Sequence, residues 1–129
     1  MSRIPGAFAK GHPALIAYVT AGYPDLNSSL ELVPRLEEWG CDIVELGIPF
    51  SDPLADGVTI QETSYKALRE GITANHCLEL AAKLRKKMSI PLIFMTYYNI
   101  LLKYGIDAFC RRAGEAGIDG IIVADMPPD

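Results

Sequence analysis

The segment from Val44 to Gly57 carries the residues whose types are best suited to chemistry. Glu45 lies within an apolar run, where a charged carboxylate is costly to bury unless it is paired or used. Asp52 and Asp56 follow on a loop that also holds two prolines and two glycines, residues that restrict or free the backbone. Burial favours the protonated form of an acid, so this pattern predicts a general acid/base with a second acid nearby.

The same acidic residues also have a purely structural interpretation. A glutamate near a strand end is more often one half of an ion pair, and aspartates commonly form turns. Asp125 favours the chemical interpretation, because it follows another apolar run and repeats the acidic strand end. Residue types alone therefore indicate a candidate acid and base at a site lined by carboxylates from the strand ends.

Metal and disulfide chemistry are not indicated by the sequence. Cys41, Cys77 and Cys110 are odd in number, far apart and without a C-x-x-C pair, so we expect three reduced thiols. His12 and His76 have no cysteine or carboxylate at metal-ligand spacing. We therefore predict no metal site.

The elements that must position these residues alternate along the chain. Four apolar runs predict strands of a buried parallel sheet: Ala14–Val19, Ile43–Leu46, Pro91–Met95 and Gly120–Ala124. Helical periodicity predicts the connections: Asn27–Trp39, Thr59–Glu70, Ala74–Lys87 and Ile106–Ala116. Asn27 or Ser28 is expected to cap the first of these helices. Alternating strands and helices predict the α/β class with right-handed βαβ units.

Periodicity leaves two architectures open, an open doubly wound sheet and a (βα)8 barrel. Polar segments rich in glycine and proline follow the carboxyl ends of the strands, where barrel enzymes keep their active sites, and this favours the barrel. A complete barrel needs about 250 residues, whereas this chain has 129. We therefore expect one domain, residues 1–129, that is the amino-terminal half of a TIM barrel and ends after its fourth strand.

Composition excludes several partners. The chain has 12 basic and 16 acidic residues and a net charge of −4, with no basic stripe for nucleic acid. Its apolar runs are far shorter than the ~20 residues of a membrane-spanning helix. The first residues lack the apolar core of a secretory signal. We expect a cytoplasmic protein.

A family resemblance narrows these alternatives. The stretch Val44–Gly57 resembles the signature of the tryptophan synthase α-subunit family, and Thr59–Gln61 follows it as in that family. Tyr18–Pro24 resembles the family's first strand and loop, and the ends of its third and fourth strands resemble Met95–Asn99 and Ala124–Pro127. A long signature with correctly spaced flanking motifs is far more specific than a short glycine motif.

The resemblance implies a lyase without a cofactor of its own. In the family, indole-3-glycerol phosphate is cleaved by a retro-aldol reaction to indole and glyceraldehyde 3-phosphate, in the last steps of tryptophan biosynthesis. By position, Glu45 matches the general acid/base and Asp56 the aspartate that stabilises charge at the indole N–H. Pyridoxal phosphate is expected only in the β partner, in an α2β2 heterotetramer.

The resemblance also implies a pocket and an interface. Residues expected to line the substrate pocket are Tyr18, Met95, Tyr97, Ile122, Ala124 and Asp125. Tyr18 and Met95 differ from the residues usual at their positions, which would alter the fit of the indole without removing the chemistry. Residues expected to face the β subunit are Pro49, Asp52, Pro53, Asn99 and Pro127.

Two other functions stay open at this stage. The half-barrel could be a non-catalytic module that docks a β-like partner, or it could belong to another phosphate-handling barrel with a different substrate. The phosphate loops of such barrels follow strands 7 and 8, beyond the four strands expected here. We therefore expect the 129-residue chain alone to be nearly inactive and to self-associate through its open edge strands.

Overall fold

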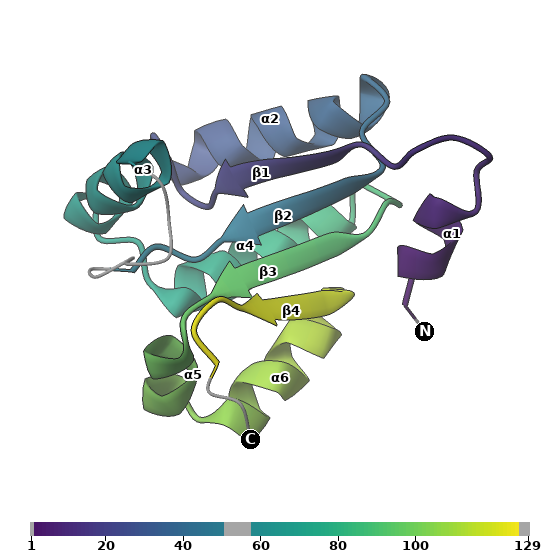
Figure 1. Ribbon diagram of the computed structural model, residues 1–129. Helices are drawn as coiled ribbons and strands as arrows, with labels where there is room; N and C mark the ends of the chain where they lie inside the picture. Colours follow the sequence, from purple (N-terminus) through teal and green to yellow (C-terminus); the bar gives the residue numbers. More distant parts are fainter. Residues whose placement is uncertain (1, 51–57, 127–129) are drawn as a thin grey trace.

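The four predicted strands form one parallel sheet. The computed structural model describes residues 2–50 and 58–126. Its strands are β1 (Ile16–Thr20), β2 (Ile43–Gly47), β3 (Leu92–Thr96) and β4 (Gly120–Val123), paired in the order β1-β2-β3-β4 (Figure 1). Each observed strand overlaps its predicted run, which confirms the α/β class.

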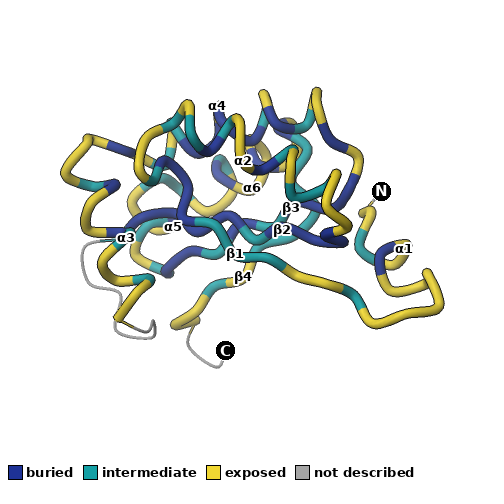
Figure 2. Tube along the Cα trace, turned by 90° about the horizontal axis from the view of Figure 1, so that it is seen from above, coloured by how far each residue is buried: buried dark blue, intermediate teal, exposed yellow. Residues whose placement is uncertain are grey.

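The strand order decides between the two architectures. An open doubly wound sheet reverses its order at a switch point, but the four described strands follow one another without reversal. Successive right-handed crossovers then place the helices on the same side. Figure 2 shows α2, α4 and α6 together on one side of the sheet. This is the arrangement of a TIM barrel over its first four strands, as expected from the sequence.

The longer helices lie close to their predicted positions. They are α2 (Leu26–Glu38), α3 (Val58–Arg69), α4 (Ala74–Arg85) and α6 (Ile106–Glu115). The predicted cap of α2 is wrong: Asp25 is the N-cap, and its carboxylate accepts a hydrogen bond from the Ser28 amide. Asp25 precedes a helix that begins one residue earlier than predicted, so Asn27 and Ser28 lie inside it. Helix α4 begins with a capping box between Thr73 and His76.

Two short helices are additions to the predicted elements. Helix α1 (Ile4–Phe8) lies beyond the amino ends of the strands, and α5 (Tyr98–Tyr104) directly follows β3 at the opposite end (Figure 1). Both are only a turn or two long, so their periodicity is too brief to detect in the sequence. Helix α5 places polar side chains beside the carboxyl ends of the strands.

The hydrophobic core fills the space between the sheet and its helices. Leu46, Leu92 and Phe94 point from the strands into this layer and are fully buried. Phe94 contacts Phe109 of α6 with ring centroids 5.8 Å apart. Burial of one such side chain stabilises the fold by about 1.5–3 kcal/mol. The core therefore fixes which strand residues point towards the helices and which point away.

The amino end of the sheet is tied to the first residues of the chain by two buried aspartates. Asp42, just before β2, accepts hydrogen bonds from Lys10 Nζ at 2.9 Å and from the Leu15 amide at 2.8 Å. Asp119, just before β4, forms ion pairs with Arg3 at 3.0 Å and Arg85 at 3.6 Å. These contacts organise the end of the sheet opposite the predicted chemistry.

Candidate active site

One face of the sheet carries the predicted acid. Ala17 and Val19 of β1, like Val44 and Leu46 of β2, belong to the core beneath the helices. Successive strand residues point to opposite faces, so Glu45 points to the face away from α2, α4 and α6. We call this the inner face. The strand register aligns Tyr18, Glu45 and Ile93 in one row across it.

Glu45 is partly buried in this row. Within residues 2–50 and 58–126, its carboxylate has neither a hydrogen-bond partner nor an ion-pair partner. The ion-pair interpretation of Glu45 therefore finds no support among these residues. A carboxylate that is held in place by a strand is suited to proton transfer with a ligand bound at this face.

Tyr18 reaches from β1 onto the end of β2. Its hydroxyl lies over Gly47, so close that a Cβ atom at Gly47 would overlap the tyrosine ring. Thr20 Oγ1 donates a hydrogen bond of 3.4 Å to this hydroxyl and lies 2.6 Å from Thr63 Oγ1 of α3. The sequence-based prediction includes Tyr18 but neither threonine. The only signal for this contact is a glycine at a strand end, which often marks a close approach.

The remaining predicted pocket residues come from β3 and β4. Met95 is partly buried and Ile122 is 43% exposed, and the register pairs them on the inner face. Ala124 is also exposed, at the end of β4. Tyr97 is only 3% exposed and stacks on Phe50 with ring centroids 4.7 Å apart. The structure thus brings Met95 and Ile122 together, whereas Tyr97 packs into the wall formed with Phe50.

Asp125 has a structural partner. Its carboxylate accepts a hydrogen bond of 2.8 Å from the Tyr98 amide, at the first residue of α5. The N-cap residue Tyr97 makes no side-chain cap of its own. Asp125 therefore caps α5 from the neighbouring strand end, where a negative charge also suits the helix dipole.

Two of the predicted interface residues lie on one groove. A hollow of about 560 Å³ is bounded by the end of β2, the turn between α3 and α4, and α5. Pro49 and Asn99 both line it, and Asn99 is exposed whereas Pro49 is buried. The groove opens at the same end of the sheet as the inner-face residues, because it follows the carboxyl ends of β2 and β3.

Four predicted residues lie outside the described part of the chain. They are Asp52, Pro53 and Asp56, within 51–57, and Pro127, within 127–129. The second predicted acid, Asp56, therefore stays a prediction from sequence.

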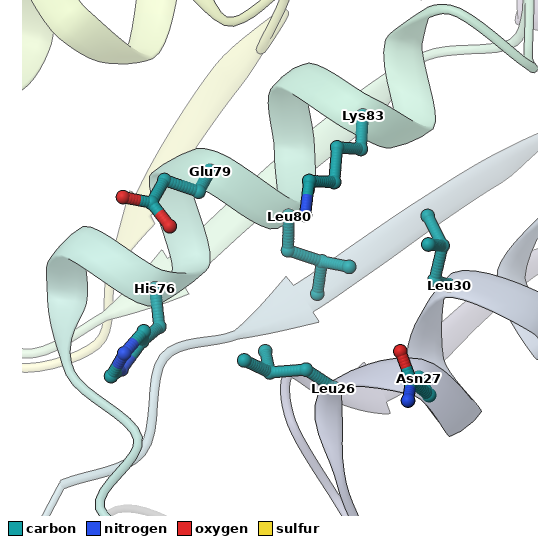
Figure 3. A pocket seen from close by; sticks show the side chains of 7 residues that line it. All are labelled: Leu26, Asn27, Leu30, His76, Glu79, Leu80 and Lys83. Atoms are coloured by element: carbon teal, nitrogen blue, oxygen red, sulfur yellow. The ribbon is translucent and has the colours of Figure 1, made fainter.

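A second hollow lies on the helical face, away from the predicted acid. It is a small cavity of about 40 Å³ between α2 and α4. Figure 3 shows its lining, with Leu26, Asn27 and Leu30 from α2 facing His76, Glu79, Leu80 and Lys83 from α4. It is too small for a ligand the size of an indole. Elsewhere in residues 2–50 and 58–126, no three histidine, cysteine or acidic side chains gather as metal ligands would. None of the helices described there is both long and apolar enough to cross a membrane.

Known proteins match this chain along its whole length. A family model described as tryptophan synthase alpha chain matches residues 6–129. The tryptophan synthase alpha chain of Dehalococcoides mccartyi is 58% identical over 128 residues, covering 99% of this chain and 50% of the relative. That of Roseiflexus sp. is 49% identical over 134 residues, covering 100% and 51% respectively. This chain thus spans about half the length of the curated relatives it matches.

Solved structures of tryptophan synthases also resemble this chain. Tryptophan synthase subunit alpha from Legionella pneumophila has a TM-score of 0.94 and 39% identity, covering 99% of this chain and 51% of that chain. A tryptophan synthase from M. tuberculosis in its aminoacrylate-bound form has a TM-score of 0.92 and 39% identity, covering 100% and 54% respectively.

Consecutive parallel strands with the helices α2, α4 and α6 on one side define this chain as part of a TIM barrel. The match over residues 6–129 then shows the family: the chain belongs to the tryptophan synthase alpha chain family. This is a lyase-type family of tryptophan biosynthesis. It carries no cofactor, and pyridoxal phosphate belongs to the beta subunit.

Proposed function

We propose that this chain supplies the catalytic half of a lyase that cleaves indole-3-glycerol phosphate to indole and glyceraldehyde 3-phosphate. The observation that carries the proposal is the carboxylate of Glu45, which lies on the inner face of β2 and has no partner within residues 2–50 and 58–126, in a chain of this family. Its position on a strand whose neighbours are buried holds the carboxylate in a defined place. Proton transfer depends on such positioning within hydrogen-bond reach of the ligand.

The proposed reaction needs one group that can both give and take a proton. Protonated Glu45 donates its proton to C3 of the indole, which turns the ring into an iminium ion. The resulting carboxylate accepts the proton of the adjacent side-chain hydroxyl as the carbonyl forms. The bond between C3 and that carbon breaks, and its electron pair returns to the ring to give neutral indole. Asp56 is proposed to stabilise the positive charge at the indole nitrogen.

The proposed pocket binds indole against apolar side chains. Met95, Ile122 and Ala124 offer apolar surface on the inner face, and Tyr18 offers an aromatic ring. Tyr97 supports the wall through its contact with Phe50. Apolar pockets with a few well-placed polar groups are typical of such ligand sites. Asp125 is proposed as a neighbour of the substrate that also holds α5.

The proposed partner is a tryptophan synthase β subunit in an α2β2 complex. Pro49 and Asn99 line the groove at the active-site end of the sheet, so a partner seated there would lie beside the reaction. Asp52, Pro53 and Pro127 are proposed to extend this interface. The proposed compartment is the cytoplasm, where thiols such as the free Cys110 stay reduced.

The test uses a completed barrel, in which residues 1–129 are joined to the carboxyl-terminal half of the Dehalococcoides mccartyi relative. We expect it to release indole from indole-3-glycerol phosphate, and Glu45→Gln to lower kcat by about a hundredfold to ten-thousandfold. The matched control is Glu79→Gln, an exposed position on α4, which should leave kcat unchanged. Full activity of Glu45→Gln would overturn the proposal.

The groove favours a second candidate function, a non-catalytic module that docks a β-like partner. In that case the completed barrel binds the partner but releases no indole, and Glu45→Gln changes neither property. We also propose that residues 1–129 alone turn over nearly no substrate. Turnover by the unmodified 129-residue chain near that of the completed barrel would contradict this.

A further inference from the structure

Three side chains from different helices meet beside the groove. Asn75 is the second residue of α4, Tyr104 is the last residue of α5, and Arg112 lies in α6. Arg112 Nη1 donates a hydrogen bond of 2.7 Å to Asn75 Oδ1 and another to the Tyr104 hydroxyl. That hydroxyl donates to Asn75 Oδ1 at 3.1 Å. We call these three residues the clamp.

The donors and acceptors of the clamp match one another. Arg112 can only donate hydrogen bonds, the Tyr104 hydroxyl donates one and accepts one, and the Asn75 carbonyl oxygen accepts two. The guanidinium also lies over the Tyr104 ring, with Cζ 5.8 Å from the ring centroid, where the aromatic face attracts a cation. Removal of one side chain therefore takes a hydrogen-bond partner from each of the other two.

The tyrosine ring connects the clamp to the core. Tyr104 packs edge-on against Phe109 of α6, with ring centroids 5.5 Å apart, and Phe109 is fully buried. The ring thus fixes the position of the hydroxyl that Asn75 accepts. Asn75 and Arg112 are exposed, and substitutions at exposed positions usually change the free energy of unfolding only slightly. The clamp is therefore better suited to setting the position of the helices than to stabilising the whole fold.

The clamp joins two sides of the groove. Ala74, which precedes Asn75, lines the side formed by the turn between α3 and α4. Lys103, which precedes Tyr104, lines the side formed by α5. Asn99, which the sequence predicts to face a partner, lies on the same side as Lys103. The hydrogen bond between Asn75 and Tyr104 therefore holds these two sides at one separation.

Helix α5 depends on such contacts for its position. It has seven residues, too few for a helix that is stable on its own in water. Asp125 holds its first residue through the Tyr98 amide, and the clamp holds its last residue. Without the clamp its carboxyl end is free to move. A mobile side of a groove has to be ordered when a partner binds, and this ordering lowers the affinity.

We propose that Asn75, Tyr104 and Arg112 are positioning residues for partner binding, which hold α5 in the arrangement that a β subunit binds. The inference rests on the proposed partner and deepens it. None of these three residues lines the groove. Their effect on the partner therefore acts through the position of α5, and it is separate from the proton transfer proposed for Glu45.

The test measures how tightly the completed barrel binds the tryptophan synthase β subunit of Dehalococcoides mccartyi, by titration calorimetry. We expect Asn75→Ala to raise the dissociation constant about threefold to tenfold, the effect of about one hydrogen bond. Asn75→Asp keeps an oxygen that accepts from Arg112 and Tyr104, so it should restore the native affinity. Tyr104→Phe keeps the ring on Phe109 but removes the hydroxyl, so it should weaken binding as well.

Two further measurements separate positioning from a general loss of stability. Amide hydrogen exchange at the carboxyl end of α5 should be faster in Asn75→Ala, because the clamp no longer holds this end. The midpoint of urea unfolding should change little. Tyr65→Phe is the matched control, because Arg69 lies over the Tyr65 ring at 5.9 Å and Tyr65 does not line the groove. It should change neither the dissociation constant nor exchange in α5.

The outcomes separate the inference from the proposed function. If Asn75→Ala and Tyr104→Phe bind the β subunit as tightly as the native barrel, the inference is wrong and the proposed partner stands. Equal weakening by Asn75→Ala and Asn75→Asp would also overturn it, because the acceptor oxygen would then be irrelevant. If the native completed barrel does not bind the β subunit, the proposed partner fails and the inference fails with it. Should Asn75→Ala not fold, Tyr104→Phe decides the inference by the same criterion.

Discussion

Removal of the Asp119 carboxylate should destabilise the fold far more than removal of its exposed partner. The Asp119 side chain is 2% exposed and forms ion pairs with Arg3 and Arg85, whose side chains are 42% and 14% exposed. Its carboxylate also accepts a hydrogen bond of 3.1 Å from the Leu92 amide, at the start of β3. Burial holds the pKa of Arg85 below its ordinary value, whereas the nearby Asp119 carboxylate raises it.

The magnitude follows from which groups lose their partner. Asp119→Ala leaves the guanidinium of Arg85 in a partly buried position without its carboxylate, and breaking a buried pair costs about 3–5 kcal/mol. The Leu92 amide loses an acceptor as well, which costs about 1 kcal/mol or more if water cannot replace it. Arg85 is not completely buried, so we expect about 3 kcal/mol in total. Arg3→Ala removes an exposed pair and should cost less than about 1 kcal/mol.

The assay is equilibrium unfolding in urea, followed by far-ultraviolet circular dichroism. With a slope of about 1–3 kcal/mol per molar urea, Asp119→Ala should lower the midpoint by about 1–3 M at an unchanged slope. Asp119→Asn keeps an acceptor for the Leu92 amide, so its urea midpoint should lie between those of Asp119→Ala and Arg3→Ala. Equal losses for Arg3→Ala and Asp119→Ala would refute the reasoning, because they would place the stabilisation in the exposed contact.

Three further predictions concern other charged groups and the thiols. The hydrogen bond from the Leu15 amide is the main reason that the pKa of Asp42 lies below its ordinary value of 3.8. Ionised Asp42 therefore stabilises the fold above pH 3.8, and this stabilisation is lost as the pH falls through the lower pKa of the folded state. In Asp42→Asn the free energy of unfolding should no longer contain this pH-dependent contribution, which acid unfolding curves would measure. Burial raises the pKa of Cys77 to about 12, whereas Cys110 is exposed. An aromatic disulfide reagent at neutral pH should react quickly with Cys110 and with Cys77 only after unfolding, and rapid native labelling of Cys77 would count against its burial. Asp125→Ala removes a helix cap and should lower the free energy of unfolding by about 1 kcal/mol. It should also speed hydrogen exchange of the Tyr98 amide, which donates its hydrogen bond to Asp125 at the start of α5. Unchanged exchange of this amide would contradict the capping role.

The strands could be located from sequence because each is a short apolar run whose helical face belongs to the core or packs against it. The predicted run Pro91–Met95 and the observed strand Leu92–Thr96 differ by one residue at each end. Hydrophobicity could not choose between an open sheet and a barrel, since both bury such runs. That choice depends on strand order, a property of the assembled sheet.

Helix ends and the candidate site show where sequence reasoning stops. The cap of α5 comes from Asp125, 27 residues after the amide that it accepts, so no local pattern around α5 reveals it. Glu45 could be singled out because an acid inside an apolar run is conspicuous. The position of the Tyr18 ring could not, because it depends on the register that aligns Ala17 with Val44 and Thr20 with Gly47.

The consecutive order of the strands bears on how the chain folds as it leaves the ribosome. Each of the strands β2, β3 and β4 pairs with the strand made just before it, so each new βα unit finds its neighbour already synthesised, and contacts of modest sequence separation form quickly. The contact between Arg3 and Asp119 differs from these, because it spans 116 positions and has to await the start of the fourth strand. Helix α1 would then dock only after β4 has been made, although it precedes every strand of this sheet along the chain.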